Sequence, residues 1–215
     1  MYQNVIFDLD GTLLNTLEDL KDSTNYALAQ HSYPTRTLEE VRCFVGNGIR
    51  KLIDRAVPEG TSVEKTDKVF ATFREYYATH SRVKTSMYEG MEQVMDALKE
   101  QNISMAIVSN KADDAVKDLA KYYFAKYIDV AIGEREGISR KPAPDSVYEA
   151  MRLLGATKEN TVYVGDSDVD RATAKNAGIP CISVTWGFRS EELLVSLEPE
   201  YLIHKPEEIL SVVTG

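Results

Sequence analysis

The feature that most constrains the fold is a short apolar run near the N-terminus that ends in two aspartates, Val5-Ile6-Phe7-Asp8-Leu9-Asp10-Gly11-Thr12. Such a run predicts a strand that is covered on both faces, as in a parallel sheet. Asp8 and Asp10 are two positions apart, so an extended backbone points both carboxylates to the same side. Two acids at the end of a buried strand are costly unless a cation or a proton compensates their charge. The run therefore predicts a metal site, although a turn followed by a helix cap also fits this pattern.

The composition limits the kinds of partner that the chain can bind. Its 215 residues are 43% hydrophobic and 27% charged, as in ordinary globular proteins. The net charge of −9 argues against nucleic acid, because a phosphate backbone requires a basic surface. A phosphorylated ligand would have to be met by local lysines, arginines or a metal. No apolar run reaches 18 residues, so we expect no membrane span.

The N-terminus and the cysteines indicate a compartment. No basic region precedes an apolar stretch at Met1-Tyr2-Gln3-Asn4, so we expect no secretory signal and a cytoplasmic protein. Cys43 and Cys181 lie outside any C-x-x-C motif. We expect both to be buried free thiols rather than a disulfide.

The pattern of apolar residues divides the chain into two parts. Helical spacing is found in four segments after the first strand, at residues 16–31, 38–44, 49–57 and 62–80. From residue 87 onward, helices alternate with apolar runs that predict strands at residues 103–108, 128–132, 161–164, 181–184 and 201–203. This alternation predicts right-handed βαβ units and a parallel sheet. We therefore expect an α/β fold with helices on both faces of the sheet, interrupted by an all-helical insertion at residues 15–82.

Polar clusters follow several of the predicted strands. In open α/β sheets, ligands bind outside the carboxyl ends of the strands. A further cation, Lys141, lies in the proline-stiffened loop Arg140-Lys141-Pro142-Ala143-Pro144 and could face the same edge. The clusters at the strand ends are Asp8 with Asp10, Ser109 with Asn110, and Asp166 with Asp170. Gathered at one edge, they would provide a nucleophile, anion-binding donors and metal ligands.

The order of these motifs resembles a known family. Asp8-Leu9-Asp10-Gly11-Thr12, Ser109-Asn110-Lys111, Lys141-Pro142-Ala143-Pro144 and Gly165-Asp166-Ser167-Asp168-Val169-Asp170 are similar to the motifs of the haloacid dehalogenase superfamily, in its phosphoglycolate-phosphatase-like branch. The likeness runs nearly end to end. It implies a Rossmann-like core domain at residues 1–14 and 83–215, and a helical cap domain at residues 15–82.

The resemblance also implies roles for the polar residues. Asp8 would attack phosphorus and form an aspartyl-phosphate. Asp10 would protonate the leaving oxygen and then activate the water that hydrolyses the intermediate. Lys141 would neutralise charge on Asp8 and on the phosphoryl group. Ser109 and Asn110 would bind phosphoryl oxygens.

The implied cofactor is Mg²⁺, a hard cation that takes few protein oxygens together with waters and a phosphate oxygen. Its ligands would be the Asp8 carboxylate, the Asp10 backbone carbonyl and Asp166, with Asp170 as an outer-shell partner. Gly11 permits a tight turn and lets backbone N–H groups approach a bound anion closely.

Asp10 favours phosphoryl transfer, because the dehalogenases and phosphonatases of this superfamily typically lack a second carboxylate at that position. We expect a Mg²⁺-dependent phosphatase for a small phosphate monoester such as phosphoglycolate, as a monomer or homodimer. The alternatives are a phosphomutase of the β-phosphoglucomutase type, a pyrophosphatase and a non-catalytic binding protein. The stretch Gly46-Asn47-Gly48-Ile49-Arg50-Lys51 is similar to the phosphoglycolate-phosphatase pattern. Within it, Arg50 or Lys51 contacts a substrate carboxylate, or the segment is simply a solvated helix face.

Overall fold

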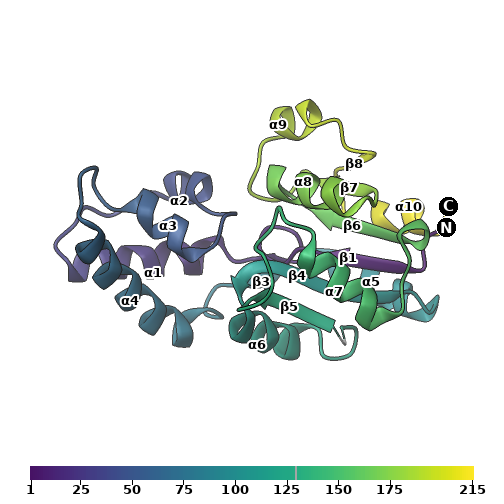
Figure 1. Cartoon of the computed structure of the whole chain (residues 1–215), viewed down its shortest axis with the longest axis horizontal. Coiled ribbons are helices and arrows are strands. Elements are labelled where there is room, and N and C mark those ends of the chain that lie inside the picture. Colours follow the sequence, from purple (N-terminus) through teal and green to yellow (C-terminus); the bar gives the residue numbers. More distant parts are fainter. Residues whose placement is uncertain (129) are drawn as a thin grey trace. The chain divides into compact units, whose positions relative to one another are not determined.

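The computed structural model describes residues 1–128 and 130–215 (Figure 1). These residues form two compact units: a core unit of residues 1–14 and 87–215, and a helical unit of residues 15–86. The chain passes between them at β2 (Leu14–Asn15) and β3 (Ser86–Met87), which form a two-stranded sheet.

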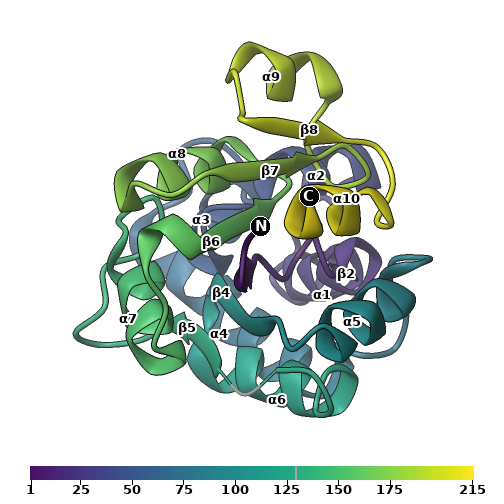
Figure 2. The ribbon, with the colours of Figure 1, turned by 90° about the vertical axis from the view of Figure 1, so that its right-hand side faces the viewer.

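The core unit is built on one parallel sheet, which Figure 2 shows. Its spatial order is β5-β4-β1-β6-β7-β8. The strands are β1 (Asn4–Phe7), β4 (Ser104–Ala112), β5 (Val130–Glu134), β6 (Thr161–Gly165), β7 (Cys181–Val184) and β8 (Tyr201–Ile203). From β1 the chain proceeds to β4 and β5 on one side, then crosses to β6 on the other. This reversal at β1 is the place where ligands bind in doubly wound folds, and the predicted α/β class is confirmed.

Helices cover both faces of this sheet, as the alternation of side chains along the strands requires. Val5 and Phe7 of β1 pack in one core cluster, and Ile6 packs in the other. The first cluster includes residues of α5 (Met91–Glu100), α6 (Asp113–Tyr123) and α10 (Glu208–Thr214). The second includes residues of α7 (Asp145–Leu154) and α8 (Asp168–Ala177). The connections also contain a 3₁₀ turn (Lys158–Asn160) and α9 (Glu191–Ser196).

The helical unit contains α1 (Leu17–Gln30), α2 (Leu38–Phe44), α3 (Ile49–Ala56) and α4 (Val63–His80). Its interior is apolar, with Leu28, Ile53 and Phe73 fully buried. One buried carboxylate, that of Asp19, is satisfied by backbone N–H groups: it accepts from Lys84 at 3.0 Å and from Thr85 at 2.8 Å. These bonds fasten the last segment of the unit to its first helix.

Two strands differ from their predicted bounds. β4 continues through Ser109 to Ala112 instead of ending at residue 108, with a register shift against β5 between Val108 and Ala112. A bulge of this kind re-aims side chains without ending the strand. β5 begins at Val130 rather than at residue 128, and Asp129, which lay within the predicted strand, is outside the described residues.

The cysteines are both free, as expected, but only Cys181 is buried; Cys43 is exposed. The expectation that Cys43 is buried was wrong, because it lies on α2 at a position that faces away from the buried Val41. Across the described ranges, the structure contains no helix whose length and apolar character would let it cross a membrane.

Candidate functional site

The site begins where β1 ends. Phe7, the last residue of β1, pairs in parallel register with Ile107 of β4 and with Val164 of β6. The next residue, Asp8, continues this pairing, since its N–H donates to the Val164 carbonyl at 2.9 Å. Asp8 therefore lies between the carboxyl ends of two neighbouring strands, at the point of strand reversal.

Lys141 joins Asp8 to residues from other elements. Its ammonium donates to Asp8 Oδ1 at 2.9 Å and to Asp170 Oδ1 at 2.7 Å. It also donates to the Tyr163 hydroxyl at 2.9 Å and to the Val108 carbonyl at 3.2 Å. The Lys141 side chain is only 3% exposed. A buried ammonium is tolerated only when it is paired in this way.

Asp166, which follows β6, packs closely between two glycines, Gly11 and Gly187. Its Oδ2 accepts from the Phe188 N–H at 2.7 Å. A Cβ added to Gly11 would lie 2.5 Å from Asp166 Oδ2, and one added to Gly187 would lie 2.2 Å from Asp166 Cβ. Only glycine fits at either position while Asp166 keeps its place. Both glycines are therefore required by the carboxylate between them.

Asp170 is placed by the start of α8. Ser167 and Asp170 form a capping box, in which Asp170 Oδ2 accepts from the Ser167 N–H and hydroxyl. The other oxygen, Oδ1, accepts from Lys141 and from the Tyr163 hydroxyl. A Cβ added to Gly165 would lie 2.3 Å from the Asp170 Cβ. The absence of a side chain at Gly165 is what allows Asp170 to approach the strand.

Asp8, Asp166 and Asp170 offer carboxylate oxygens that all lie within 4.8 Å of one another. All three residues are buried, with exposed fractions of 8%, 2% and 1%. Together with Lys141 they carry an excess of negative charge when every group is ionised. Oxygen donors at this spacing and an excess of negative charge fit a hard divalent cation such as Mg²⁺. The residues present are therefore suited to the predicted cofactor.

The excess of negative charge in the cluster also shifts the pKa values of its members. Burial and the neighbouring Asp170 raise the pKa of Asp8 well above its usual range, against the opposing effect of Lys141. Burial and Asp170 also raise the pKa of Asp166 to about 7. Burial opposes the charge on Lys141, but Asp170 and Asp8 outweigh it and hold its pKa well above the usual range. An additional cation beside these carboxyl groups would favour their ionised forms.

Asp10, the proposed acid and base, is less buried and has a different partner. The Lys111 ammonium donates to Asp10 Oδ1 at 2.8 Å, and the Lys111 side chain is 2% exposed against 20% for Asp10. The two nearby aspartates of the first motif are thus held by two different lysines. Lys111 was part of a motif noted in the sequence but had no predicted role.

The predicted phosphate-binding groups near β4 are partly engaged elsewhere. The Asn110 side chain donates to the Lys141 carbonyl at 3.1 Å and accepts from the Lys141 N–H at 2.8 Å, so it fixes the Lys141 backbone. Ser109 Oγ accepts from the Lys111 N–H at 3.2 Å. The Gly11 N–H donates to the Leu14 carbonyl at 2.9 Å, so it closes the turn. Asn110 therefore lies against Lys141 with its side chain bonded to backbone groups, and phosphate binding by Ser109 and Asn110 stays a prediction.

Arg50 belongs to the helical unit, on α3. Its guanidinium pairs with Asp54 at 2.8 Å and with Asp67 of α4, and lies 5.7 Å from the centre of the Phe70 ring. Lys51 on the same helix is 59% exposed and pairs with Asp54 at 3.8 Å. Arg50 is therefore anchored within its own unit by two carboxylates, which fits the helix-face interpretation of this segment.

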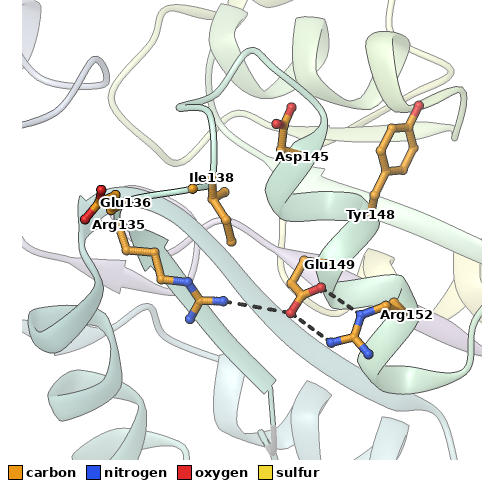
Figure 3. Close-up of a pocket in the computed structure, with 8 residues that line it drawn as sticks. Arg135, Glu136, Ile138, Asp145, Tyr148, Glu149 and Arg152 are labelled. Atoms are coloured by element: carbon orange, nitrogen blue, oxygen red, sulfur yellow. Dashed lines mark hydrogen bonds and ion pairs between the residues drawn. The ribbon is translucent and has the colours of Figure 1, made fainter.

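A surface pocket in the core unit lies between the end of β5 and α7 (Figure 3). It contains Arg135 and Arg152, but both guanidinium groups pair with Glu149, at 3.9 Å and 2.8 Å. Glu136 and Asp145 add further negative charge to the lining. None of its lining residues belongs to the carboxylate cluster, and its charge does not suit a phosphate group.

Two features of the site had no counterpart in the sequence prediction. The first is Tyr163, whose hydroxyl contacts Lys141 and Asp170. The second is the segment after β7, which supplies Gly187 and the Phe188 N–H to Asp166. A signal existed for Tyr163, because a hydroxyl in the apolar run Val162-Tyr163-Val164 needs a buried partner. No comparable signal marked residues 187 and 188.

Comparisons with known proteins fit this geometry. Residues 5–184 match the family model described as haloacid dehalogenase-like hydrolase. Phosphoglycolate phosphatase 1 of Pseudomonas aeruginosa is 32% identical over 96% of this chain and 78% of its own length. Pyrophosphatase PpaX of Halalkalibacterium halodurans is 30% identical over 97% of this chain and 95% of its own. A crystal structure from Lactobacillus delbrueckii subsp. bulgaricus superposes with a TM-score of 0.93 at 32% identity, covering 99% of this chain and 98% of that one.

Proposed function

The chain belongs to the haloacid dehalogenase-like hydrolase family, and from this premise we propose that it is a Mg²⁺-dependent phosphatase for a small phosphorylated metabolite. The observation that supports this proposal most strongly is the buried cluster in which Asp8 contacts Lys141 and lies beside Asp166 and Asp170. A carboxylate oriented by an ammonium, next to a cation site, is the arrangement that attack on a charged phosphoryl group requires.

The reaction proceeds in two displacements at phosphorus. A carboxylate oxygen of Asp8 forms a bond to phosphorus while the bond to the leaving oxygen breaks, and the leaving oxygen takes a proton from Asp10. Water then attacks the phosphorus of the aspartyl-phosphate and gives a proton to Asp10, and the Asp8 carboxylate is released. Lys141 stays charged throughout and offsets the negative charge of both carboxylate and phosphoryl group.

Three groups would hold the metal: the Asp8 and Asp166 carboxylates and the Asp10 backbone carbonyl, with Asp170 in the outer shell. The chemistry that Mg²⁺ supplies when bound is neutralisation of phosphoryl oxygens and orientation of the phosphate toward Asp8. Phosphate-monoester hydrolysis is among the slowest uncatalysed reactions, so positioning and several fixed charges must act together.

Phosphoglycolate is the first candidate substrate, because a relative that matches 96% of this chain carries that name. Pyrophosphate is the second, because a relative named for it matches 97% of the chain. Arg50 was predicted as one possible contact for a substrate carboxylate. Its guanidinium pairs with Asp54 and Asp67, which weakens this argument for phosphoglycolate. We further propose that the helical unit is the cap domain and that the protein acts in the cytoplasm as a monomer or homodimer.

The test is an activity screen of the purified protein with Mg²⁺ against 2-phosphoglycolate, pyrophosphate and hexose 1-phosphates. We expect phosphate release that is abolished by a chelator and by Asp8→Asn. The matched control is Asp168→Asn, which alters an aspartate of the same motif as Asp166 whose side chain is 48% exposed and pairs with Arg189; this variant should stay active. Hydrolysis that survives in Asp8→Asn would contradict the proposal. Conversion of hexose 1-phosphate to 6-phosphate faster than phosphate release would instead identify a mutase.

A further inference from the structure

Tyr163 lies in the middle of β6, with its side chain in the core cluster that α7 and α8 cover. The residue is fully buried. Its aromatic ring therefore packs as an ordinary core side chain. Packing requires only the ring, so the hydroxyl needs a separate explanation. A buried hydroxyl costs free energy unless it is hydrogen-bonded, so the partners of this group decide what it contributes.

Those partners are the ammonium and a carboxylate of the site. The Lys141 ammonium donates to the Tyr163 hydroxyl at 2.9 Å, and the hydroxyl donates to Asp170 Oδ1 at 3.0 Å. Lys141 also donates directly to the same Asp170 oxygen at 2.7 Å. The three groups form a closed ring of hydrogen bonds, and each bond in it involves at least one charged group. Such bonds are stronger and more directional than those between neutral groups.

This ring acts on a flexible side chain. Lysine carries its charge on a four-carbon stem with many rotamers, and the Lys141 ammonium has three protons for four oxygen acceptors. The hydroxyl accepts a hydrogen bond from the ammonium and donates one to Asp170. It thereby fixes the ammonium at the position from which it reaches Asp8 at 2.9 Å.

We propose that Tyr163 is a positioning residue for the phosphatase reaction: its hydroxyl holds the Lys141 ammonium against Asp8 through the shared contact with Asp170. This inference rests on the proposed function, because it assigns to Lys141 the task of offsetting charge at the reacting group. The hydrogen bonds of the Tyr163 hydroxyl to Lys141 and Asp170 are its means of acting on Asp8.

The experiment compares Tyr163→Phe with Tyr127→Phe, both measured with p-nitrophenyl phosphate and Mg²⁺ as the probes. Tyr127 is a matched control, since it is also buried in the core unit and its hydroxyl donates to a carboxylate, Asp96, at 2.9 Å. Each variant keeps the aromatic ring and loses one hydrogen bond from a tyrosine hydroxyl to a carboxylate. We expect kcat to fall about tenfold in Tyr163→Phe, with KM and the half-saturating Mg²⁺ concentration unchanged, and about twofold or less in Tyr127→Phe.

Two results would overturn the inference. One is a kcat for Tyr163→Phe no lower than that of Tyr127→Phe. The other is a lowered kcat accompanied by weaker substrate and Mg²⁺ binding, which indicates a general loosening of the core. If the wild-type protein hydrolyses no phosphate ester, the proposed function fails instead, so the two failures are distinct.

A double-mutant cycle keeps the test decisive if Tyr163→Phe is destabilised. If the hydroxyl acts through Asp170, then Tyr163→Phe should lower kcat in the wild-type background but have little further effect in an Asp170→Asn background. Equal fold-changes in the two backgrounds would show that the hydroxyl acts independently of the ring and would reject the assignment.

Discussion

Each unit of this protein contains a cation that bridges two carboxylates, and the two bridges differ in their surroundings. In the core unit, Lys141 joins Asp8 and Asp170, and all three side chains are at most 11% exposed. In the helical unit, Arg50 joins Asp54 and Asp67, with side chains 32–55% exposed. The same pattern of charges is therefore in a low-dielectric interior at Lys141 and in contact with water at Arg50.

Burial, more than the ion pair itself, distinguishes the candidate functional site from the rest of the molecule. Exposed pairs are solvated and screened, and they contribute little to stability. Buried charges are costly to desolvate, and an interior without them is often at least as stable. A protein that keeps Lys141 and three carboxylates in its interior does so at the expense of stability, as expected where charge is needed for chemistry.

The largest expected effect comes from removing the buried Lys141, and removal of the exposed Arg50 is its counterpart. Lys141→Met leaves two buried carboxylates without their partner, which should lower the free energy of unfolding by about 3–5 kcal/mol. It should also lower kcat by at least ~10²-fold, as the loss of a preorganised charge does elsewhere. Arg50→Met should change the free energy of unfolding by less than about 1 kcal/mol. Chemical denaturation of both variants measures the difference, and equal stability losses would break the contrast.

The second prediction compares two glycines. In Gly165→Ala the new Cβ would lie 2.3 Å from the Asp170 Cβ, so Asp170 must shift. A displacement near 1 Å at a catalytic centre can cost ~10²-fold in rate. In Gly60→Ala, in the helical unit, the Cβ would meet nothing within 4 Å, and the cost is limited to the positive φ of +79°, about 1–2 kcal/mol. We expect activity to be lost in the first variant alone; an active Gly165→Ala enzyme would show that Asp170 is not held where the structure places it.

The smallest effect concerns the two thiols. Burial raises the pKa of Cys181 to about 12, so at pH 8 almost none of it is the reactive thiolate. Cys43 in the helical unit is exposed. A thiol reagent should modify Cys43 in the folded protein and both cysteines after unfolding. Peptide mapping by mass spectrometry identifies the modified residue, and rapid labelling of Cys181 in the native state would disprove its burial.

Much of the fold followed from local patterns. The apolar runs predicted the strands of the parallel sheet, because strands covered on both faces leave a strong signal. The parallel register then brings Asp8 alongside β6, as its bond to the Val164 carbonyl shows. Features near the ends of strands are therefore accessible to reasoning from the sequence.

The contacts that orient the charged groups were less accessible. Lys111 and Asp10 are 101 positions apart, and Tyr163 and Lys141 are 22 apart. Which buried polar groups meet depends on side-chain packing across the sheet, which no local spacing encodes. Gly187 and Phe188 act on Asp166 through a missing side chain and a backbone N–H, and neither feature marks a polar site in the sequence.

If buried carboxylates of the core unit share one divalent cation, calorimetric titration of the protein with Mg²⁺ will detect that site. We predict a single saturable site in the wild-type protein that is lost in Asp166→Asn and retained in Asp168→Asn. Absence of binding at millimolar Mg²⁺, or binding that is unaffected by Asp166→Asn, would contradict the account.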